Sequence, residues 1–270
     1  MGSRRWDELT IANDFVFCKA MLNESLCCDV LEAILGVPVE HIEYAGRQTV
    51  LDASPDAKAV RLDVYVRDET QAVYDVEMQM TDTHELPQRT HYYHALMALD
   101  QIQRGEEYRD LKKAYAIFIC GFDPFGHGHR VYCFENTCQS AGSLVLGDGA
   151  QTIFLAAPAP SSVAQSDRLN ELLDFVDQGR VTGKLSARLQ AEVTAVLDDE
   201  KWRLEYMHLE VRDQLNRNEG RAEGIACGEA RLAALLQALM AQDRMDDARD
   251  AVNDPVRREE LYRELNGAVP

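Results

Sequence analysis

The sequence lacks the features that mark several classes of protein. Its longest apolar run, AYAIFIC at residues 114–120, is far shorter than the roughly 20 residues that a membrane helix needs. The N-terminal residues MGSRRWDELT lack the apolar core of a secretory signal. The seven cysteines are odd in number and contain no CxxC repeat, so they indicate neither a disulfide framework nor a zinc site. These absences predict a protein of the reducing cytoplasm with no membrane partner.

Positive charge is also scarce. The chain has 28 Lys and Arg residues against 46 Asp and Glu residues, which gives a net charge of −18. Affinity for a nucleic-acid backbone comes largely from Lys and Arg side chains that neutralise phosphates. The composition therefore argues mildly against a dedicated DNA-binding module, although a local basic groove, bound metal ions or an oligomer could still bind DNA. The phosphate-cradling GxxxxGKS/T and dinucleotide GxGxxG motifs are absent too.

Length and pattern predict one main domain with a helical extension. The chain has 270 residues, 46% of them hydrophobic, which is enough for one sizeable core and an appendage. We predict a mixed α/β domain over residues 1–160. Its expected elements are a helix over 11–35, strands over 42–51, 61–68, 72–80, 113–122, 131–134 and 152–156, and a helix within 84–104 that begins near Pro87. Residues 161–270 show helical patterns and form a candidate oligomerisation or regulatory segment.

Three glycines interrupt the helical extension at intervals of four residues, at positions 220, 224 and 228. In a helix they would lie in one nearly straight row, which would let another helix approach closely. Each would cost about 1 kcal/mol relative to alanine if nothing packed against it. The alternative interpretation is a flexible linker, and the sequence leaves both open.

The stretch RLDVYVRDETQAVYDVEMQM at residues 61–80 predicts a hairpin with a three-residue loop at 69–71. Pairing Val66 with Tyr74 and Val64 with Val76 gives one continuous apolar face, and a slip of one residue would destroy it. The other face of this register places Asp63 opposite Glu77, with Gln79 two residues further along the strand.

Two ionised carboxylates on directly opposed strand positions repel each other, because their Cβ atoms are only about 4.5–5.5 Å apart. A proton, a basic side chain or a divalent cation between Asp63 and Glu77 would relieve the repulsion. Mg²⁺ prefers one or two carboxylates and completes its shell with water and substrate phosphates. The pair therefore predicts a metal site for phosphodiester cleavage, unless these acids merely point into solvent from an exposed hairpin face.

Four stretches carry a resemblance to a known family. They are NDFVFCKAML at residues 13–22, RLDVYV at 61–66, VEMQM at 76–80 and RTHYYHALMALDQIQRGEEY at 89–108. Together they resemble the PD-(D/E)XK nuclease superfamily, and within it the Rpn-type recombination-promoting nucleases, or putative transposases. The resemblance implies an α/β fold with a restriction-endonuclease-like αβββαβ core, a mixed sheet flanked by helices, and an α-helical C-terminal extension. It also implies DNA endonuclease activity that depends on Mg²⁺ or Mn²⁺, in recombination or mobile-element biology.

The resemblance also implies roles for individual residues. Asp63 and Glu77 would be metal ligands and catalytic residues. Gln79 stands in place of the superfamily's lysine, so it could orient a water molecule but could not supply a positive charge or a titrating base. Asp14 could complete the metal shell, or it could simply be an acid at a helix N-terminus. The residues implied in substrate binding lie on the helix after the hairpin: Arg89, Tyr93 and Gln101. Tyr92 and Tyr93 could instead be core aromatics.

Two other functions remain open at this point. One is a catalytically inactive nuclease-fold protein that acts in binding or assembly. The other is a DNA reader in the helical tail, for which the acidic composition of residues 231–265 is poor. For the endonuclease, cutting two strands with one site per chain favours a homodimer. Basic residues clustered near the hairpin would offset the acidic surface; the candidates are Arg61, Arg67, Arg89, Arg104, Lys112 and Lys113.

Overall fold

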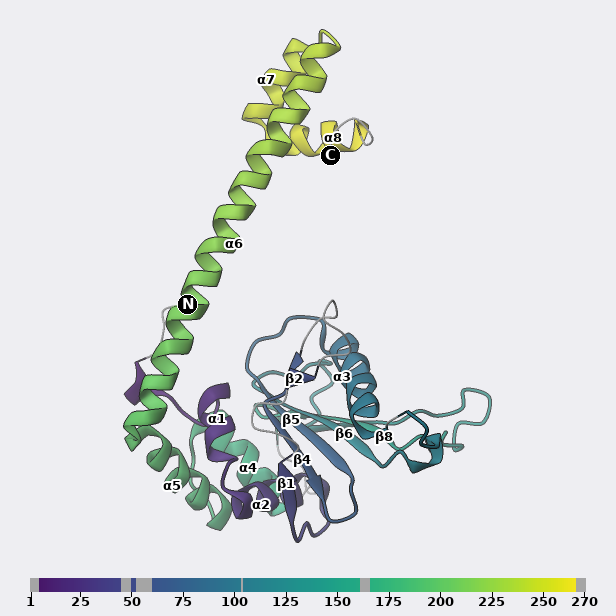
Figure 1. Cartoon of the computed structure of the whole chain (residues 1–270), viewed down its shortest axis with the longest axis vertical. Helices are drawn as coiled ribbons and strands as arrows, with labels where there is room; N and C mark the ends of the chain where they lie inside the picture. The colour runs from purple at the N-terminus through teal and green to yellow at the C-terminus, as the bar shows by residue number, and fades with distance from the viewer. Residues whose placement is uncertain (1–4, 45–49, 52–59, 103, 161–165, 266–270) are drawn as a thin grey trace. The chain divides into compact units, whose positions relative to one another are not determined.

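The computed structural model describes residues 5–44, 50–51, 60–102, 104–160 and 166–265 (Figure 1). By their contacts the residues fall into two compact units, Met1–Arg203 and Leu204–Pro270. The domain boundary expected between residues 160 and 161 stays a prediction. By contacts, α4 (Asp167–Gln178) and α5 (Lys184–Asp198) belong with the first unit, because they pack against α1 and α2.

The first unit is built on a six-stranded mixed sheet in the order β1-β4-β5-β6-β8-β7. Neighbours β5, β6 and β8 run parallel, whereas β1, β4 and β7 pair antiparallel to their neighbours. The bounds are β1 (Ile42–Tyr44), β4 (Val64–Asp68), β5 (Val73–Gln79), β6 (Ala114–Cys120), β7 (Val131–Phe134) and β8 (Ala150–Ala156). A separate two-stranded sheet pairs β2 (Val50–Leu51) with β3 (Val60–Arg61).

Helices cover both faces of the six-stranded sheet. Figure 1 shows α3 (Leu86–Gln101) on one side and α1, α2, α4 and α5 on the other. The central strand β6 is accordingly buried along its length apart from the half-exposed Tyr115, as its continuous apolar run predicts. This mixed sheet with flanking helices, followed by a helical C-terminal part, confirms the predicted restriction-endonuclease-like α/β fold.

The first helical region consists of two helices rather than the single one expected over residues 11–35. They are α1 (Asp14–Ala20) and α2 (Glu24–Leu35). Each begins after an asparagine whose side chain accepts a backbone N–H: Asn13 from Val16, and Asn23 from Leu26. Gly36 ends α2 with a φ of 71°, a left-handed conformation that glycine adopts without strain.

The hairpin has the register expected from its apolar pattern. Val64 lies opposite Val76, and Val66 lies opposite Tyr74. The strand expected over 42–51 is instead divided between β1 and β2, which belong to different sheets, and residues 45–49 lie outside the described residues. The regular ladder stops at Val64, so the pairing expected between Asp63 and Glu77 lies just beyond the regular strand, where the chain bends.

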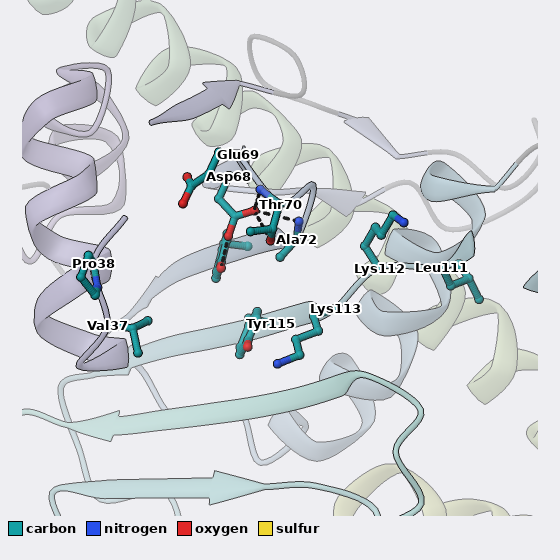
Figure 2. A pocket seen from close by; sticks show the side chains of 11 residues that line it. Val37, Pro38, Asp68, Glu69, Thr70, Ala72, Leu111, Lys112, Lys113 and Tyr115 are labelled. Carbon is teal, nitrogen blue, oxygen red and sulfur yellow. Dashed lines mark hydrogen bonds between the residues drawn. The ribbon is translucent and has the colours of Figure 1, made fainter. Parts of the chain in front are cut away.

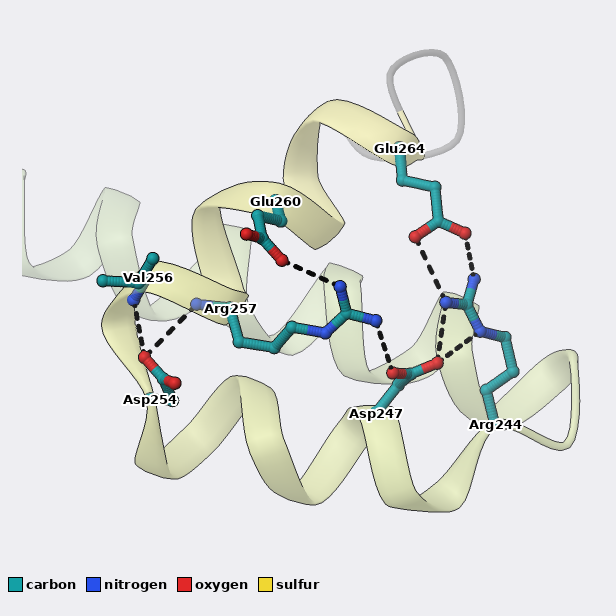
Figure 3. Close-up of polar contacts among 7 residues, drawn as sticks. All are labelled: Arg244, Asp247, Asp254, Val256, Arg257, Glu260 and Glu264. Carbon is teal, nitrogen blue, oxygen red and sulfur yellow. Dashed lines mark hydrogen bonds and ion pairs between the residues drawn. The ribbon is translucent and has the colours of Figure 1, made fainter.

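The second unit consists of the long helix α6 (Glu200–Ala241) from Leu204 onward, with α7 (Met245–Asn253) and α8 (Pro255–Glu264) folded against its end. Leu235, Leu239 and Leu261 lie in its small apolar core. A charged network ties the last helices together, as Figure 3 shows: Asp247 accepts from Arg244 and Arg257. The three glycines lie within α6. A side-chain carbon added to any of them would have no other described part of the protein within 4 Å, apart from the neighbouring backbone of α6 itself.

By length and composition alone, α6 contains a window that is apolar enough to cross a membrane. Such a single helix is weak support for a membrane span, because core helices of other proteins pass the same test. The absence of a membrane partner therefore stays a prediction.

Candidate active site at the end of the hairpin

Asp63 and Glu77 meet where the β4–β5 ladder ends. The Asp63 backbone N–H donates to Glu77 Oε1 at 3.1 Å, and the Met78 backbone N–H donates to Asp63 Oδ2 at 3.1 Å. Each carboxylate thus accepts a hydrogen bond from the main chain of the opposite strand. These bonds favour the charged forms and hold both side chains at fixed positions beside each other.

Arg89 reaches this pair from α3. Its guanidinium donates to Gln79 Oε1 at 2.6 Å, to Glu77 Oε2 at 3.1 Å and to the Tyr93 hydroxyl at 2.8 Å. The guanidinium carbon also lies 5.4 Å and 5.5 Å from the ring centroids of Tyr93 and Phe118. Arg89 and Tyr93 share one face of the helix because they are four residues apart. One cation therefore spans two of the three residues expected to be catalytic.

A third carboxylate, Asp75, was not singled out by the sequence. It lies on the same strand face as Glu77 and Gln79, it is fully buried, and both of its carboxylate oxygens lack a hydrogen-bond partner among the described residues. The alternation of 75, 77 and 79 along one strand was the available signal. Asp75 lies opposite Tyr65 in the hairpin, and a tyrosine at that position does not by itself indicate a metal or catalytic site.

Burial sets the electrostatics of the site. Glu77 is 5% exposed, and burial together with the charge of Asp63 raises its pKa to about 8, although Arg89 and the Asp63 amide act in the opposite direction. Burial and the charges of Glu77 and Asp63 also raise the pKa of Asp75 well above its usual range. Without a cation Glu77 therefore holds a proton at neutral pH, which is one of the three ways of relieving its repulsion with Asp63.

The donor set fits a hard divalent cation. Asp63 and Glu77 offer only oxygen ligands, and Mg²⁺ requires no more than one or two carboxylates from the protein. The unpartnered oxygens of buried Asp75 are a further unsatisfied carboxyl group beside them. No set of three or more His, Cys, Asp or Glu side chains in the described part of the chain is arranged as a complete metal cage. The site thus suits an ion that keeps water and takes oxygen atoms from its substrate.

Two of the expected residues lie apart from this group. Asp14 is exposed at the first residue of α1, and its Oδ1 accepts the N–H of Phe15. Gln101 lies at the far end of α3 from Arg89, where its Oε1 accepts the N–H of Lys112. The structure therefore brings together Asp63, Glu77, Gln79, Arg89 and Tyr93. The roles expected of Asp14 and Gln101 stay predictions without a described contact to that group.

The expected basic cluster does not form around the carboxylates. Arg67 is paired with Asp100 at 2.6 Å. Lys112 and Lys113 precede β6, at the end of that strand opposite the one beside Gln79. There they line a separate cavity of about 430 Å³, together with Tyr115 and residues of the β4–β5 turn (Figure 2). Arg104 is exposed, and the Arg61 side chain lies outside the described residues. Arg89 is the cation that the described structure places in the site.

The comparison with known proteins agrees with this geometry. A family model described as a PD-(D/E)XK nuclease family transposase matches residues 11–173, which include the whole sheet and every residue of the site. No curated protein and no solved structure matches the chain. Because the family model covers more than half of the 270 residues, the chain belongs to the PD-(D/E)XK nuclease family transposases.

Proposed function

We propose that this protein is a divalent-metal-dependent DNA endonuclease that hydrolyses phosphodiester bonds in recombination or mobile-element biology. The observation that carries the proposal is the reciprocal arrangement of Asp63 and Glu77, in which main-chain N–H groups hold the two carboxylates beside each other. A solvent-exposed hairpin face would not need such an arrangement. Mg²⁺ or Mn²⁺ is the cofactor whose ligand preferences the pair meets.

Each residue of the site then has its own role in cleavage. Asp63 and Glu77 would hold the metal, which when bound polarises the phosphate and makes a water molecule more acidic. Gln79 is neutral, so it orients water through its amide and does not take up a proton. Arg89 supplies the positive charge that Gln79 lacks, and its guanidinium matches the geometry of a phosphate anion. Tyr93 positions Arg89 through its hydroxyl.

A second candidate function is binding without catalysis. It is favoured by the scarcity of basic side chains near the carboxylates and by the contacts of Arg89, which already neutralise part of the site. In that case the fold would serve assembly, and metal would neither stabilise the protein nor support cleavage.

We also propose a reducing cytoplasmic location and a dimeric protein. All seven cysteines are free thiols, including the exposed Cys133 and Cys227. Such thiols persist in a reducing compartment. A two-fold dimer would present two sites to the two strands of a duplex.

The proposal is tested by incubating the purified full-length protein with supercoiled plasmid in Mg²⁺, Mn²⁺, Ca²⁺ or EDTA. We expect nicking or linearisation with Mg²⁺ or Mn²⁺, none with EDTA, and none with Asp63→Ala or Glu77→Ala. An inactive wild type whose melting temperature is unchanged by Mg²⁺ would favour the binding protein instead. Cleavage that survives both substitutions would place the active site elsewhere.

The same assay separates the charge of Arg89 from its packing. We expect Arg89→Ala to slow cleavage by about 100-fold, the usual effect of removing one group that stabilises developing charge. Adding Gln79→Lys to Arg89→Ala should recover part of that loss, because it returns a cation to the same place. If the double variant is no faster than Arg89→Ala at an equal melting temperature, Arg89 does not act through its charge.

A further inference from the structure

Part of α6 packs against no other described segment of its own unit. Every residue from Val211 to Arg231 is exposed. Among them are large apolar side chains: Val211 is 61% exposed, Leu215 is 61% exposed and Ile225 is 54% exposed. A helix that is exposed all round is stable only when other interactions support it. Here three glycines weaken it further, because glycine is a poor helix former.

Four of the six exposed large apolar side chains of α6 lie on one seam, and Met207 and Met240 lie outside it. Alternating steps of four and three residues lead from Leu204 along the whole helix, which is the spacing of a coiled-coil interface. We call these positions the α6 seam: Leu204, His208, Val211, Leu215, Asn218, Ala222, Ile225, Glu229, Leu232, Leu236 and Leu239. Eight of the eleven are apolar. The glycines lie outside the seam, and Gly220 lies on nearly the opposite side of the helix, since five residues turn a helix by about 500°.

Only part of the seam is available to a partner. The C-terminal end is covered within the unit, where Leu239 is buried and Leu236 packs against the core formed with α7 and α8. The free part runs from Leu204 to Glu229. Its midpoint falls between Asn216 and Arg217, and its length is about 40 Å at 1.5 Å per residue.

We propose that the free seam binds the same seam of a second copy of this chain, in antiparallel orientation. A two-fold axis near residues 216 and 217 makes the two free segments coincide along their full length. It places Val211 opposite Ala222 and Leu215 opposite Asn218 of the second copy. A parallel pair would instead bring the two Glu229 side chains together in the seam, which like charges disfavour.

Charge supports the second copy as the occupant. The chain carries −18 overall, but α6 contains six basic and seven acidic residues, so two α6 helices repel each other little. The antiparallel register also sets Arg212 beside Glu219 of the second copy, twice by symmetry. These two residues are seven apart in one helix, too far to pair with each other within it. A lipid surface fits the segment less well, because the free seam is flanked by charged residues of both signs.

The test is the mass of the full-length protein in solution, measured by light scattering and sedimentation from 1 to 100 μM (about the range in which dimers of moderate affinity dissociate). We expect a dimer. Leu215→Glu should weaken it at least tenfold, whereas Gly220→Glu, a matched control on the other side of the helix, should not. Far-UV circular dichroism checks that both variants stay helical.

Charge reversal tests the orientation. Arg212→Glu and Glu219→Arg should each weaken the dimer at least tenfold, and the double variant should restore it, because the reversed charges again oppose each other across the antiparallel interface. A monomeric wild type would overturn the proposal. The proposal would also be overturned if the double variant dimerised no more tightly than the single variants, or if Gly220→Glu alone abolished the dimer. Flotation of the wild type with phosphatidylcholine vesicles would overturn it as well.

Discussion

Glu77 connects the folding of the protein to the chemistry of its site. It is a carboxyl group almost without solvent contact, next to two other carboxyl groups and one arginine. A protonated Glu77 relieves the repulsion in the metal-free protein, and a metal ion would have to displace that proton. Stability and metal binding should therefore depend on pH through the same residue.

We expect the metal-free protein to become less stable as pH rises from about 5 to about 9. Glu77 has a pKa of about 8 in the fold, against 4.5 as its ordinary value. Between these values the folded state binds more protons than the unfolded state, so the free energy of unfolding falls with rising pH. Urea unfolding in EDTA measures this slope. Glu77→Gln should flatten it.

A matched control is Asp123→Asn. Asp123 also accepts several hydrogen bonds, but these lower its pKa, so its effect has the opposite sign and lies in the acidic range. A slope that Glu77→Gln leaves unchanged between pH 5 and 9 would show that Glu77 is already charged in the metal-free fold.

At the residue scale the sequence predicts what local spacing determines. The alternation along the hairpin predicts that Asp63 and Glu77 meet, and the four-residue step predicts that Arg89 and Tyr93 share a helix face. It does not reveal that Arg89 contacts Gln79, because that contact depends on how α3 lies across the sheet. Nor does it reveal the burial of Asp75, which requires the packing of distant segments.

At the element scale, one side chain stabilises the start of α2 after the break that follows α1. Asn23 accepts the Leu26 N–H at 3.2 Å and donates from Nδ2 to Glu192 of α5 at 2.8 Å. It therefore caps α2 and also ties it to another helix. The apolar spacing of residues 11–35 runs through this position, which is why periodicity alone predicts one helix there.

We expect Asn23→Ala to lower the free energy of unfolding by about 2 kcal/mol, the sum of a lost cap and a lost hydrogen bond. Asn23→Ser keeps the cap and should lose only about 1 kcal/mol. Asn13→Ala removes a cap of the same kind from α1 and is the comparison for the cap alone. Urea unfolding of the three variants measures the differences. Equal losses for Asn23→Ala and Asn23→Ser would mean that the cap contributes nothing.

The sheet was easier to predict than the helices around it. A strand buried on both faces, such as β6, has a continuous apolar run, and the hairpin register follows from its apolar face. The short strands β2 and β3 have only two residues each and carry no such pattern, so their pairing with each other could not be predicted. The grouping of α4 and α5 with the first unit depends on contacts with α1 and α2, which periodicity does not report.

At the scale of the whole molecule, electrostatics opposes DNA binding. The net charge is −18, and Arg67 and Arg89 are both paired with acids in the fold. Divalent cations at the carboxylates would remove part of this repulsion and contact the phosphates directly. The protein should therefore bind DNA through metal more than through a basic surface.

We expect binding to a 30-base-pair duplex (about three helical turns) to be at least tenfold tighter in Ca²⁺ than in EDTA. The affinity should depend only weakly on salt, because few phosphates are neutralised by Lys or Arg. Fluorescence anisotropy at several salt concentrations measures both quantities. Tight binding in EDTA with a steep salt dependence would instead indicate a basic surface outside the site.

The chain order of the site has a consequence for how the protein is made. All five residues that meet there lie between Asp63 and Tyr93, in the hairpin and the helix that follows it. The neighbouring strand β6, whose Phe118 lies beside Glu77 in the sheet, comes later in the chain. During translation, the five site residues are therefore synthesised before the strand that packs beside them. Until β6 is in place the carboxylates remain hydrated and keep the acidity of ordinary side chains.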